Sequence, residues 1–370
     1  MRRETLTPRL AWQARVEALG LDFHTTDGQP YWWEAACYAF SSVEVDVLEA
    51  ATEALHQMCL QAVDRLVTDG GLARVHIPEK YRDWVAASWR RRDPDLYGRF
   101  DLAFDGRSPP KLLEYNADTP TALLEAAAVQ WYWLEQVKPG RDQFNSIHER
   151  LIAAWAELRE RHPKTSRVHF AGVLDVPEDL RTLEYMRDVC GQAGWTAQQL
   201  DMSQIGWNGR AFTDAAERPI EALFKLYPWE WMLSESFGEH LLADCTAFIE
   251  PPWKMVLSNK AILPILWEMF PDHPNLLPAS FDRAGVPGAC VEKPVHGREG
   301  ADIRLLGAQE SGTGGKDRIY QAAYKLPVFD GMHAVIGSWI VAGKSAGIGM
   351  REDPSPITTN ASHFVPHYFA

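Results

Sequence analysis

Two short alternating segments constrain the fold of this chain more than any other feature of its sequence. Polar and apolar residues alternate over 99–104 and again over 111–116, and the intervening residues 105–110 are rich in Asp, Gly, Ser and Pro. Because successive side chains of a strand point to opposite faces, this pattern predicts a β-hairpin with one polar face.

The polar face of this hairpin carries the first candidate site. Glu114 and Asn116 stand two residues apart on one strand, and Asp101 lies within reach on the other. Two carboxylates and an amide oxygen suit Mg²⁺, which takes few protein ligands and leaves its other positions to phosphate and water. Arg99 shares the face and could pair with Asp101 or hold an anionic substrate. An ordinary charged strand face remains the alternative.

The rest of the chain mixes helices with strands, and no repeat of 20–50 residues occurs. Apolar residues at three-and-four spacing predict helices in the first quarter, whereas a βαβ pattern begins at residue 166. We therefore expect an α+β or α/β fold. The expected helices are 9–18, 43–67, 122–136, 178–193 and 259–270, and the expected strands are 168–174, 196–200, 220–226, 289–292 and several short ones beyond residue 290.

Length and charge exclude several classes of protein. A chain of 370 residues needs two or three lobes. Its 37 Lys and Arg against 50 Asp and Glu give a net charge of −13, which opposes general binding to nucleic acid. No apolar run approaches the roughly 18 residues of a membrane-spanning helix, and no signal peptide is evident, so we expect a cytoplasmic protein.

Other chemistries lack their central residues. The five cysteines are scattered without a C-x-x-C pair, which indicates buried, reduced thiols and neither zinc nor disulfides. His363 and His367 flank Pro366 and do not form a helical metal motif, and no G-x-S-x-G elbow occurs. Aromatic residues are more often core than binding platform, so we expect core positions for Trp131, Trp133, Trp229 and Trp231.

Three further segments carry positive charge in settings that suit phosphate. Lys293 ends a predicted strand and precedes a loop with two glycines, whose backbone N–H groups can approach an anion closely. Lys260 stands at a predicted helix start, where the helix dipole favours phosphate. Arg351 lies in a glycine-flanked segment that we expect to be mobile and able to fold over a phosphoryl group. Each could instead be an ordinary surface residue, and neither a Walker A nor a Rossmann motif is present.

Several stretches in this order resemble the synthetase domain of the glutathionylspermidine synthase family, which is an ATP-grasp-like family of carboxylate–amine ligases. The stretches are RFDLAFDG, KLLEYNADTPTALLEAA, FIEPPWKMVLSNKAILPILW, EKPVHGREGADI, GSWIVAGKSAGIGMRE and ITTNASHFVPH. The hairpin precedes the lysines, whereas common ATP-grasp enzymes place their metal residues last. The resemblance therefore implies a circularly permuted ATP-grasp-like fold with a small α/β, pre-ATP-grasp-like lobe.

The resemblance also implies roles for individual residues. Arg351 and Arg99 are implied to act in catalysis, and Asp101, Glu114 and Asn116 to hold Mg²⁺. The residues implied to bind ATP are Lys260, Lys293, Gly297, Arg298, Gly300 and Gln321. The residues implied to face the acid are Arg99, Thr119 and Thr121, and those implied to face a polyamine are Asp175, Glu178 and Asp179.

By the same resemblance, ATP would convert an acid into an acyl phosphate that a polyamine or related amine then attacks. Leu226 stands where a small hydroxyl residue would suit glutathione, so the acid is left open. The alternatives are an amide ligase for another acid and amine, such as an amino acid, and a non-catalytic ATP-binding paralogue. The bifunctional members carry an upstream amidase domain, and since this chain starts in the synthetase part we expect no amidase activity.

The expected organisation follows from these assignments. We expect small-molecule partners only, with no nucleic acid and no membrane, and the oligomeric state is left open with a homodimer as one option. The expected parts are a helical region with the metal hairpin (1–150), a small α/β substrate lobe (151–245), an ATP-binding lobe with the Lys-Pro/Gly loop (246–330) and a C-terminal β segment (331–370).

Overall fold

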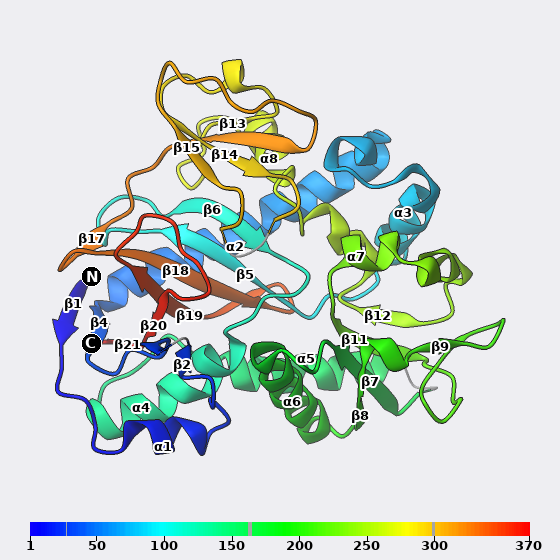
Figure 1. Ribbon diagram of the computed structural model, residues 1–370, viewed down its shortest axis with the longest axis horizontal. Coiled ribbons are helices and arrows are strands. Elements are labelled where there is room, and N and C mark those ends of the chain that lie inside the picture. The colour runs from blue at the N-terminus through cyan, green and yellow to red at the C-terminus, as the bar shows by residue number, and fades with distance from the viewer. Residues whose placement is uncertain (27, 162–164, 298–299) are drawn as a thin grey trace.

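The computed structural model describes all residues except 27, 162–164 and 298–299. Its centre is a six-stranded sheet in which strands from opposite halves of the chain pair (Figure 1). The predicted hairpin is confirmed as an antiparallel pair, and its first strand pairs with the longest C-terminal hairpin. The strands of this sheet are β5 (Tyr97–Ala103), β6 (Lys111–Asn116), β17 (Val328–Phe329), β18 (Met332–Val341), β19 (Lys344–Asp353) and β20 (His363–Val365).

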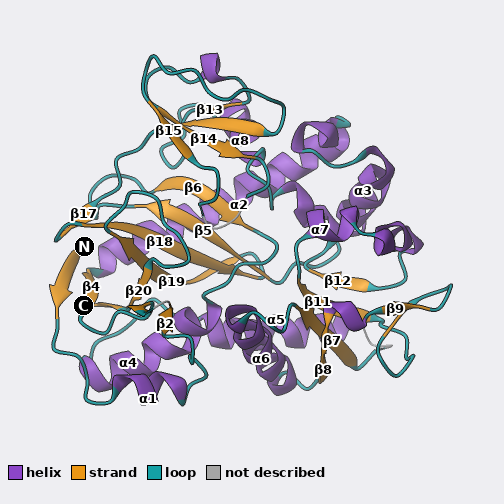
Figure 2. Ribbon diagram, in the orientation of Figure 1, coloured by secondary structure: helices purple, strands orange, loops and turns teal. Residues whose placement is uncertain are grey.

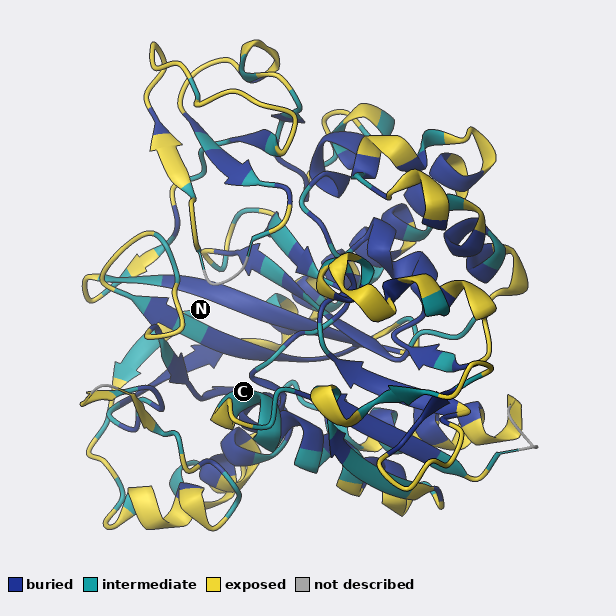
Figure 3. Cartoon of the chain, turned by 45° about the vertical axis from the view of Figure 1, so that its right-hand side comes forward, coloured by how far each residue is buried: buried dark blue, intermediate teal, exposed yellow. Residues whose placement is uncertain are grey.

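One long helix, α2 (Ser42–Thr68), packs against β18 and β19. It begins at a capping box in which the Ser41 side chain accepts from the Glu44 N–H and the Glu44 side chain accepts from the Ser41 N–H. Its buried stripe includes Leu48 and Leu55, as the three-and-four spacing predicts. Figure 3 shows the central strands beside it as buried along most of their length.

The predicted βαβ unit is confirmed in a second, parallel sheet with the order β12-β11-β7-β8. Helix α6 begins with Pro177 in its first turn, where a missing N–H costs no helical hydrogen bond. Strand β12 completes this sheet although it lies beyond residue 245, where we expect the α/β lobe to end. The elements are α5 (Ile147–Arg161), β7 (Arg167–Gly172), α6 (Pro177–Gln192), β8 (Thr196–Asp201), β11 (Ala222–Leu226), α7 (Trp229–Ser234) and β12 (Ala247–Ile249).

A third, antiparallel sheet stands apart at the top of Figure 2, with α8 (Ile262–Met269) packed against it. This helix tolerates Pro264 because the proline lies in its first turn, where N–H groups have no helical acceptor. The strands of this sheet, in spatial order, are β13 (Ala279–Ser280), β16 (Arg318–Ala322), β14 (Cys290–Pro294) and β15 (Arg304–Leu306).

The two ends of the described chain meet in a fourth sheet, where β4 lies between β1 and β21 (Figure 1). Of the remaining helices, α1 and α4 lie together below the central sheet in this view. The bounds are β1 (Arg2–Thr5), α1 (Trp12–Glu17), β2 (Thr25–Thr26), β3 (Gln29–Pro30), β4 (Ala36–Phe40), α3 (Arg82–Arg91), α4 (Gln130–Val137), β9 (Gly206–Trp207), β10 (Phe212–Thr213) and β21 (His367–Phe369).

The structure differs from the sequence predictions in one helix and in the placement of two tryptophans. The helix expected over 122–136 is α-helical at 123–124, contains a π-helical turn over Glu125–Val129 and continues as α4. Trp133 and Trp229 are buried as expected, but Trp131 and Trp231 are 38% and 45% exposed, so two of the four tryptophans are not core residues. No helix among the described residues is long and apolar enough to cross a membrane.

Candidate functional site

The hairpin face brings together the three predicted metal ligands. The strand register pairs Asp101 with Glu114 and Arg99 with Asn116. Asp101 forms a 2.7 Å ion pair with the Nε of Arg99, and the Asn116 amide donates to Asp101 at 3.2 Å and to Glu114 at 3.3 Å. Because the alternation of a strand fixes which side chains share a face, the sequence was sufficient to predict this cluster.

The two carboxyl groups of this face differ in their electrostatic surroundings. Burial raises the pKa of Asp101, although the ion pair with Arg99 opposes this shift. Burial also acts to raise the pKa of Glu114, but the charges of Lys260 and Lys293 outweigh it and lower that pKa to about 2. Glu114 is therefore an anion at neutral pH and balances two lysines.

Lys260 joins the hairpin face to the loop after β14. It lies two residues before the start of α8, and its Nζ donates to the Gly297 carbonyl at 2.6 Å and lies 3.4 Å from a Glu114 carboxylate oxygen. Its own N–H bonds to the Val295 carbonyl at 2.9 Å. A long side chain that reaches from the helix start to a carboxylate can also reach an anion placed between them.

Lys293 sits behind this face, on β14, and is buried. Its Nζ donates to the Leu113 carbonyl at 2.8 Å and to the Gln321 side-chain oxygen at 2.7 Å, while the Gln321 amide donates to the Leu112 carbonyl at 3.0 Å. Burial lowers the pKa of Lys293 to about 8, although Glu114 opposes this shift. Two residues that we predict to bind ATP thus fasten β14 and β16 to β6.

The loop after β14 that contains Gly297 and Gly300, which we call the glycine loop, lies close to the hairpin face. Gly300 has a φ of 71°, in the left-handed region that favours glycine, and a Cβ added there would lie 2.8 Å from the Thr358 carbonyl oxygen. Gly297 supplies the carbonyl that accepts from Lys260. The predicted ATP contact of Arg298 lies outside the described residues.

Arg351 occupies a regular strand, so the expectation of a mobile glycine-flanked segment is wrong. β19 pairs with β18 on one side and β20 on the other. The neighbouring glycines serve packing, because a Cβ at Gly347 would lie 2.7 Å from the Phe144 carbonyl and one at Gly349 would lie 2.9 Å from the Phe364 ring. The Arg351 guanidinium bonds to the Thr359 carbonyl at 2.7 Å.

These elements surround one cleft of about 400 Å³. It lies where the central sheet, the parallel sheet and the loop after β14 meet. The predicted site residues that line it are Arg99, Asp101, Glu114, Asn116, Thr119, Thr121, Glu178, Asp179, Lys260, Gly297, Gly300 and Arg351. The predicted residues absent from its lining, apart from the undescribed Arg298, are Asp175, Lys293 and Gln321, and Asp175 is exposed to solvent.

The α/β lobe contributes an acidic wall to this cleft, formed by Glu178 and Asp179 in the first turn of α6 and by Glu230 in α7. Tyr227 and Trp231 stand beside it with their rings edge to face, 5.3 Å apart. Sequence reasoning missed Glu230, and it assigned Trp231 to the core. A half-exposed tryptophan has no local pattern that distinguishes it from a buried one.

Leu226 also lines the cleft and is buried at the end of β11. It therefore presents an apolar side chain to the cleft. Across the cleft, Arg99 is held in place by the Thr121 carbonyl, which accepts from its Nη1 at 2.7 Å. Asp101 raises the pKa of Arg99, although burial opposes the charged form.

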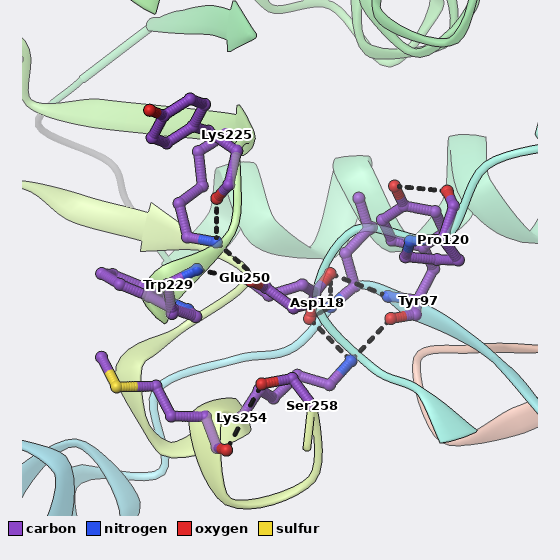
Figure 4. Close-up of polar contacts among 11 residues, drawn as sticks. Tyr97, Asp118, Pro120, Lys225, Trp229, Glu250, Lys254 and Ser258 are labelled. Atoms are coloured by element: carbon purple, nitrogen blue, oxygen red, sulfur yellow. Dashed lines mark hydrogen bonds and ion pairs between the residues drawn. The ribbon is translucent and has the colours of Figure 1, made fainter. Parts of the chain in front are cut away.

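A sealed ion pair, one member of which lines the cleft, was not predicted (Figure 4). Asp118 pairs through one carboxylate oxygen with Lys225 and accepts the Trp229 N–H with the other at 3.0 Å. Lys225 also donates to the Tyr227 carbonyl at 3.0 Å and lies over the Trp229 ring, 4.3 Å from its centre. The pair thereby ties the loop after β6 to the end of β11 and the start of α7.

A second buried pair supports the first strand of the hairpin. Glu250 accepts hydrogen bonds from the backbone N–H groups of Leu96 and Tyr97 (Figure 4). Its carboxylate also forms an ion pair with Lys254 at 2.8 Å. Burial raises the pKa of Glu250 to about 7, although Lys254 opposes this shift. Lys254 also donates to the Tyr97 carbonyl at 2.6 Å, so the pair holds the start of β5 by its backbone.

The donor set of the hairpin face fits Mg²⁺ in kind. Asp101, Glu114 and Asn116 supply hard oxygen atoms at the edge of the cleft, and this cation needs only one or two carboxylates when phosphate oxygens complete its shell. The Asn116 amide would have to present its oxygen instead of its NH₂ group. Among the described residues, no group of three or more His, Cys, Asp and Glu side chains could hold a metal ion.

Comparisons with known proteins agree with the resemblance. The chain matches the family described as glutathionylspermidine synthase preATP-grasp over residues 3–370. It is 42% identical over 374 residues to a Haemophilus influenzae protein provisionally named an acid–amine ligase, with 95% of each chain covered. It is 30% identical over 365 residues to the bifunctional glutathionylspermidine synthetase/amidase of Escherichia coli K12, and this match covers 88% of the chain and 58% of that protein.

A solved structure of a Methylobacillus flagellatus KT protein, provisionally named a γ-glutamylcysteine synthetase, aligns with 84% of this chain and 87% of its own. The TM-score is 0.44 and the sequence identity is 10%. The family assignment rests on the sequence matches, which extend over nearly the whole length described above. The chain belongs to the glutathionylspermidine synthase preATP-grasp family.

Proposed function

We propose that this protein is an ATP-dependent ligase that joins a carboxylic acid to an amine through an acyl phosphate. One observation carries the proposal. A single cleft is lined by an oxygen-rich hairpin face, by the cations Arg99, Lys260 and Arg351, and by the acidic wall. Groups suited to phosphate and groups suited to a cation thus share one cleft. The names of the two relatives support the same reaction class.

The chemistry follows from the low reactivity of a carboxylate. A carboxylate oxygen attacks the γ-phosphorus of ATP, ADP leaves, and the acid becomes an acyl phosphate. The amine nitrogen then attacks the acyl carbon and loses a proton, and inorganic phosphate leaves with the electrons of the broken C–O bond. The protein mainly orients the reactants and balances charge, which is the usual basis of such catalysis.

Asp101, Glu114 and Asn116 would hold Mg²⁺, which neutralises phosphate charge and orients the nucleotide when bound. Lys260 is placed to contact the phosphates, because its Nζ lies between Glu114 and the glycine loop. Lys293 supports the hairpin from behind and already uses two of its three N–H donors within the protein.

For the acid, Arg99 is the cation nearest the hairpin face, and Thr119 and Thr121 belong to the loop beside it. For the amine, we assign the acidic wall, with Glu178 and Asp179 as the principal contacts. A polyamine fits this arrangement, since one amine must be neutral to attack while distal ammonium groups can rest on carboxylates. We also propose that the fold is a circularly permuted ATP-grasp arrangement. We propose that it consists of the four parts predicted from the sequence.

The test is ADP release by the purified protein, with Mg²⁺ and ATP, against a matrix of acids and amines. We expect release to need both an acid and an amine, and spermidine to be a better acceptor than a singly charged amine. The variant with Glu178→Gln and Asp179→Asn should raise KM for the polyamine by about 10-fold or more and change kcat less. The variant Asp175→Asn, changed outside the cleft, is the matched control.

Two outcomes would contradict this proposal in different ways. ATP binding without ADP release for any acid and amine would favour a non-catalytic ATP-binding protein. Equal use of singly charged amines, unaffected by the double substitution, would leave the ligase activity supported but would contradict a polyamine as its acceptor.

A further inference from the structure

A buried carboxyl group close to the cleft is not used by the proposed reaction. Glu125 is 1% exposed and opens the π-helical turn Glu125–Val129. Such turns are rare and frequently mark functional sites. Just before it, Ala122 has a φ of 63°, a left-handed conformation that is costly for a residue with a Cβ. The backbone is therefore strained close to Glu125.

The partner of Glu125 is Tyr31, whose hydroxyl donates to its Oε1 at 2.6 Å. Tyr31 is itself buried, and the Arg351 guanidinium lies over its ring at 5.3 Å from the ring centre. This distance is within the range of a cation–π contact. A chain of two contacts thus runs from Glu125 through Tyr31 to Arg351.

Arg351 itself has few other restraints. Its Nη2 donates to the Thr359 carbonyl, and among the described residues its buried Nε has no hydrogen-bond partner. A buried donor without a partner is costly, and a ligand oxygen in the cleft is the kind of acceptor that would satisfy it. The face of the guanidinium, by contrast, rests on the Tyr31 ring.

We propose that Tyr31 and Glu125 are positioning residues that hold the Arg351 guanidinium over the transferring phosphoryl group. Glu125 fixes the ring through the hydroxyl, and the ring supports the guanidinium from one side. The proposal rests on the proposed function only in taking Arg351 as the phosphoryl-contacting arginine. Neither Tyr31 nor Glu125 lines the cleft, so both act through Arg351.

The charges around Glu125 make this device sensitive to pH. Burial and the nearby Glu178 raise the pKa of Glu125 to about 7, although the Tyr31 hydrogen bond and Arg351 oppose the shift. Burial also raises the pKa of Tyr31, which therefore remains a hydroxyl donor. The carboxylate form, which attracts the hydroxyl more strongly, is populated above about pH 7. A cation bound at Glu178 would favour that form.

The test compares Tyr31→Phe, which keeps the ring, and Glu125→Gln, which keeps the shape, with the matched control Tyr38→Phe. Tyr38 is also buried and donates to a buried glutamate, Glu352, at 2.7 Å, but the pair does not line the cleft. The probe is Mg²⁺ and ADP with aluminium fluoride, which occupies the position of the transferring phosphoryl group. Affinities for ADP alone and with aluminium fluoride are measured by calorimetry.

We expect Tyr31→Phe and Glu125→Gln each to weaken ADP binding with aluminium fluoride by at least about fivefold, the effect of one ordinary hydrogen bond, and to leave ADP binding unchanged. The double variant should be no weaker than the single ones, because the pair acts as a unit. Tyr38→Phe should bind both as the parent does. Where turnover is observed, kcat of the parent should rise through about pH 7, and Glu125→Gln should lack this rise.

The inference is overturned if Tyr31→Phe and Glu125→Gln bind ADP with aluminium fluoride as tightly as the parent. It is equally overturned if Tyr38→Phe weakens this binding as much as they do, since a general loss of packing would then explain the effect. A parent that gains no affinity from aluminium fluoride would contradict the phosphoryl role of Arg351, and with it both proposals. A parent that gains affinity but accepts no amine would contradict the ligase proposal alone.

Discussion

Two ion pairs at the cleft differ in their exposure to solvent. In the pair of Arg99 with Asp101, each side chain is 16% exposed and lines the cleft. In the pair of Lys225 with Asp118, the side chains are 0% and 4% exposed, although Asp118 also lines the cleft. The open pair has the exposure to exchange partners with a ligand, whereas the sealed pair mainly holds two segments together through its backbone contacts.

The difference shows that charge beside a cleft does not by itself indicate catalysis. The sealed pair is linked on every side to backbone groups, such as the Trp229 N–H and the Tyr227 carbonyl. Those contacts orient the end of β11 and the start of α7, which carry Leu226 and Glu230 of the cleft. We infer that the sealed pair sets where the acidic wall stands and the open pair meets the substrate.

The largest expected effect is on stability and comes from a substitution that breaks the sealed pair. Lys225→Ala leaves Asp118 buried without its cation and should lower the free energy of unfolding by about 3–5 kcal/mol, measured by urea denaturation. Arg99→Met at the open pair should cost roughly half of that or less, because Asp101 keeps access to solvent and to Asn116.

A control separates lost charge pairing from lost packing. The double variant with Asp118→Leu and Lys225→Met carries no buried charge and should recover most of the stability of the parent. Equal losses for Lys225→Ala and Arg99→Met would show that the two pairs do not differ as described.

The second prediction concerns a charge that lines the cleft and takes part in an exposed ion pair. Glu114→Ala should lower the rate of ADP release by about 100- to 1000-fold, the cost of removing one well-placed charge contact from a reacting group. Its stability should stay within about 1 kcal/mol of the parent, because the Glu114 side chain is 27% exposed and its ion pair is open to solvent.

Glu114→Gln keeps the shape of the side chain and removes its charge, so it should lose turnover to a similar degree. Undiminished ADP release in either variant would remove the hairpin face from the reaction. Thermal unfolding of each variant checks that the fold is retained.

The smallest expected effect distinguishes the two lysines that Glu114 balances. Lys260→Ala should weaken ATP binding by about 10- to 150-fold, equivalent to about 1.5–3 kcal/mol for a charge-assisted contact. Lys293→Met should weaken it by about 10-fold or less, since the Lys293 Nζ is already bonded to Leu113 and Gln321. Calorimetry with a non-hydrolysable ATP analogue measures both, and a larger effect of Lys293→Met would reverse the assignment.

Local patterns of the sequence predicted much of the fold and one face of the site. Alternation over 99–104 and 111–116 was sufficient to place Asp101 and Glu114 side by side, because a strand repeats every two residues. The βαβ unit followed from periodicity and from the proline and glycine at the ends of its helix. In these cases the relevant interactions are between neighbours in the sequence.

The remaining features depend on contacts between distant segments. Nothing near Lys225 in the sequence indicates that it pairs with Asp118, and nothing near Glu230 indicates that it joins Glu178 in one wall. The glycines around Arg351 suggested mobility, but they are required where β19 passes close to other segments. A glycine at a tight contact and a glycine at a hinge look the same in a sequence.

The pairing of β5 with β18 has a consequence for synthesis of this protein on the ribosome. The edge of β5 that will receive β18 is complete at residue 103, but β18 begins only at residue 332. At about 5–20 residues per second, the nascent hairpin must wait on the order of 10–45 s with that edge unpaired. An unpaired strand edge is prone to join other chains, so nascent chains are exposed to aggregation during this interval and are expected to engage chaperones until β18 emerges.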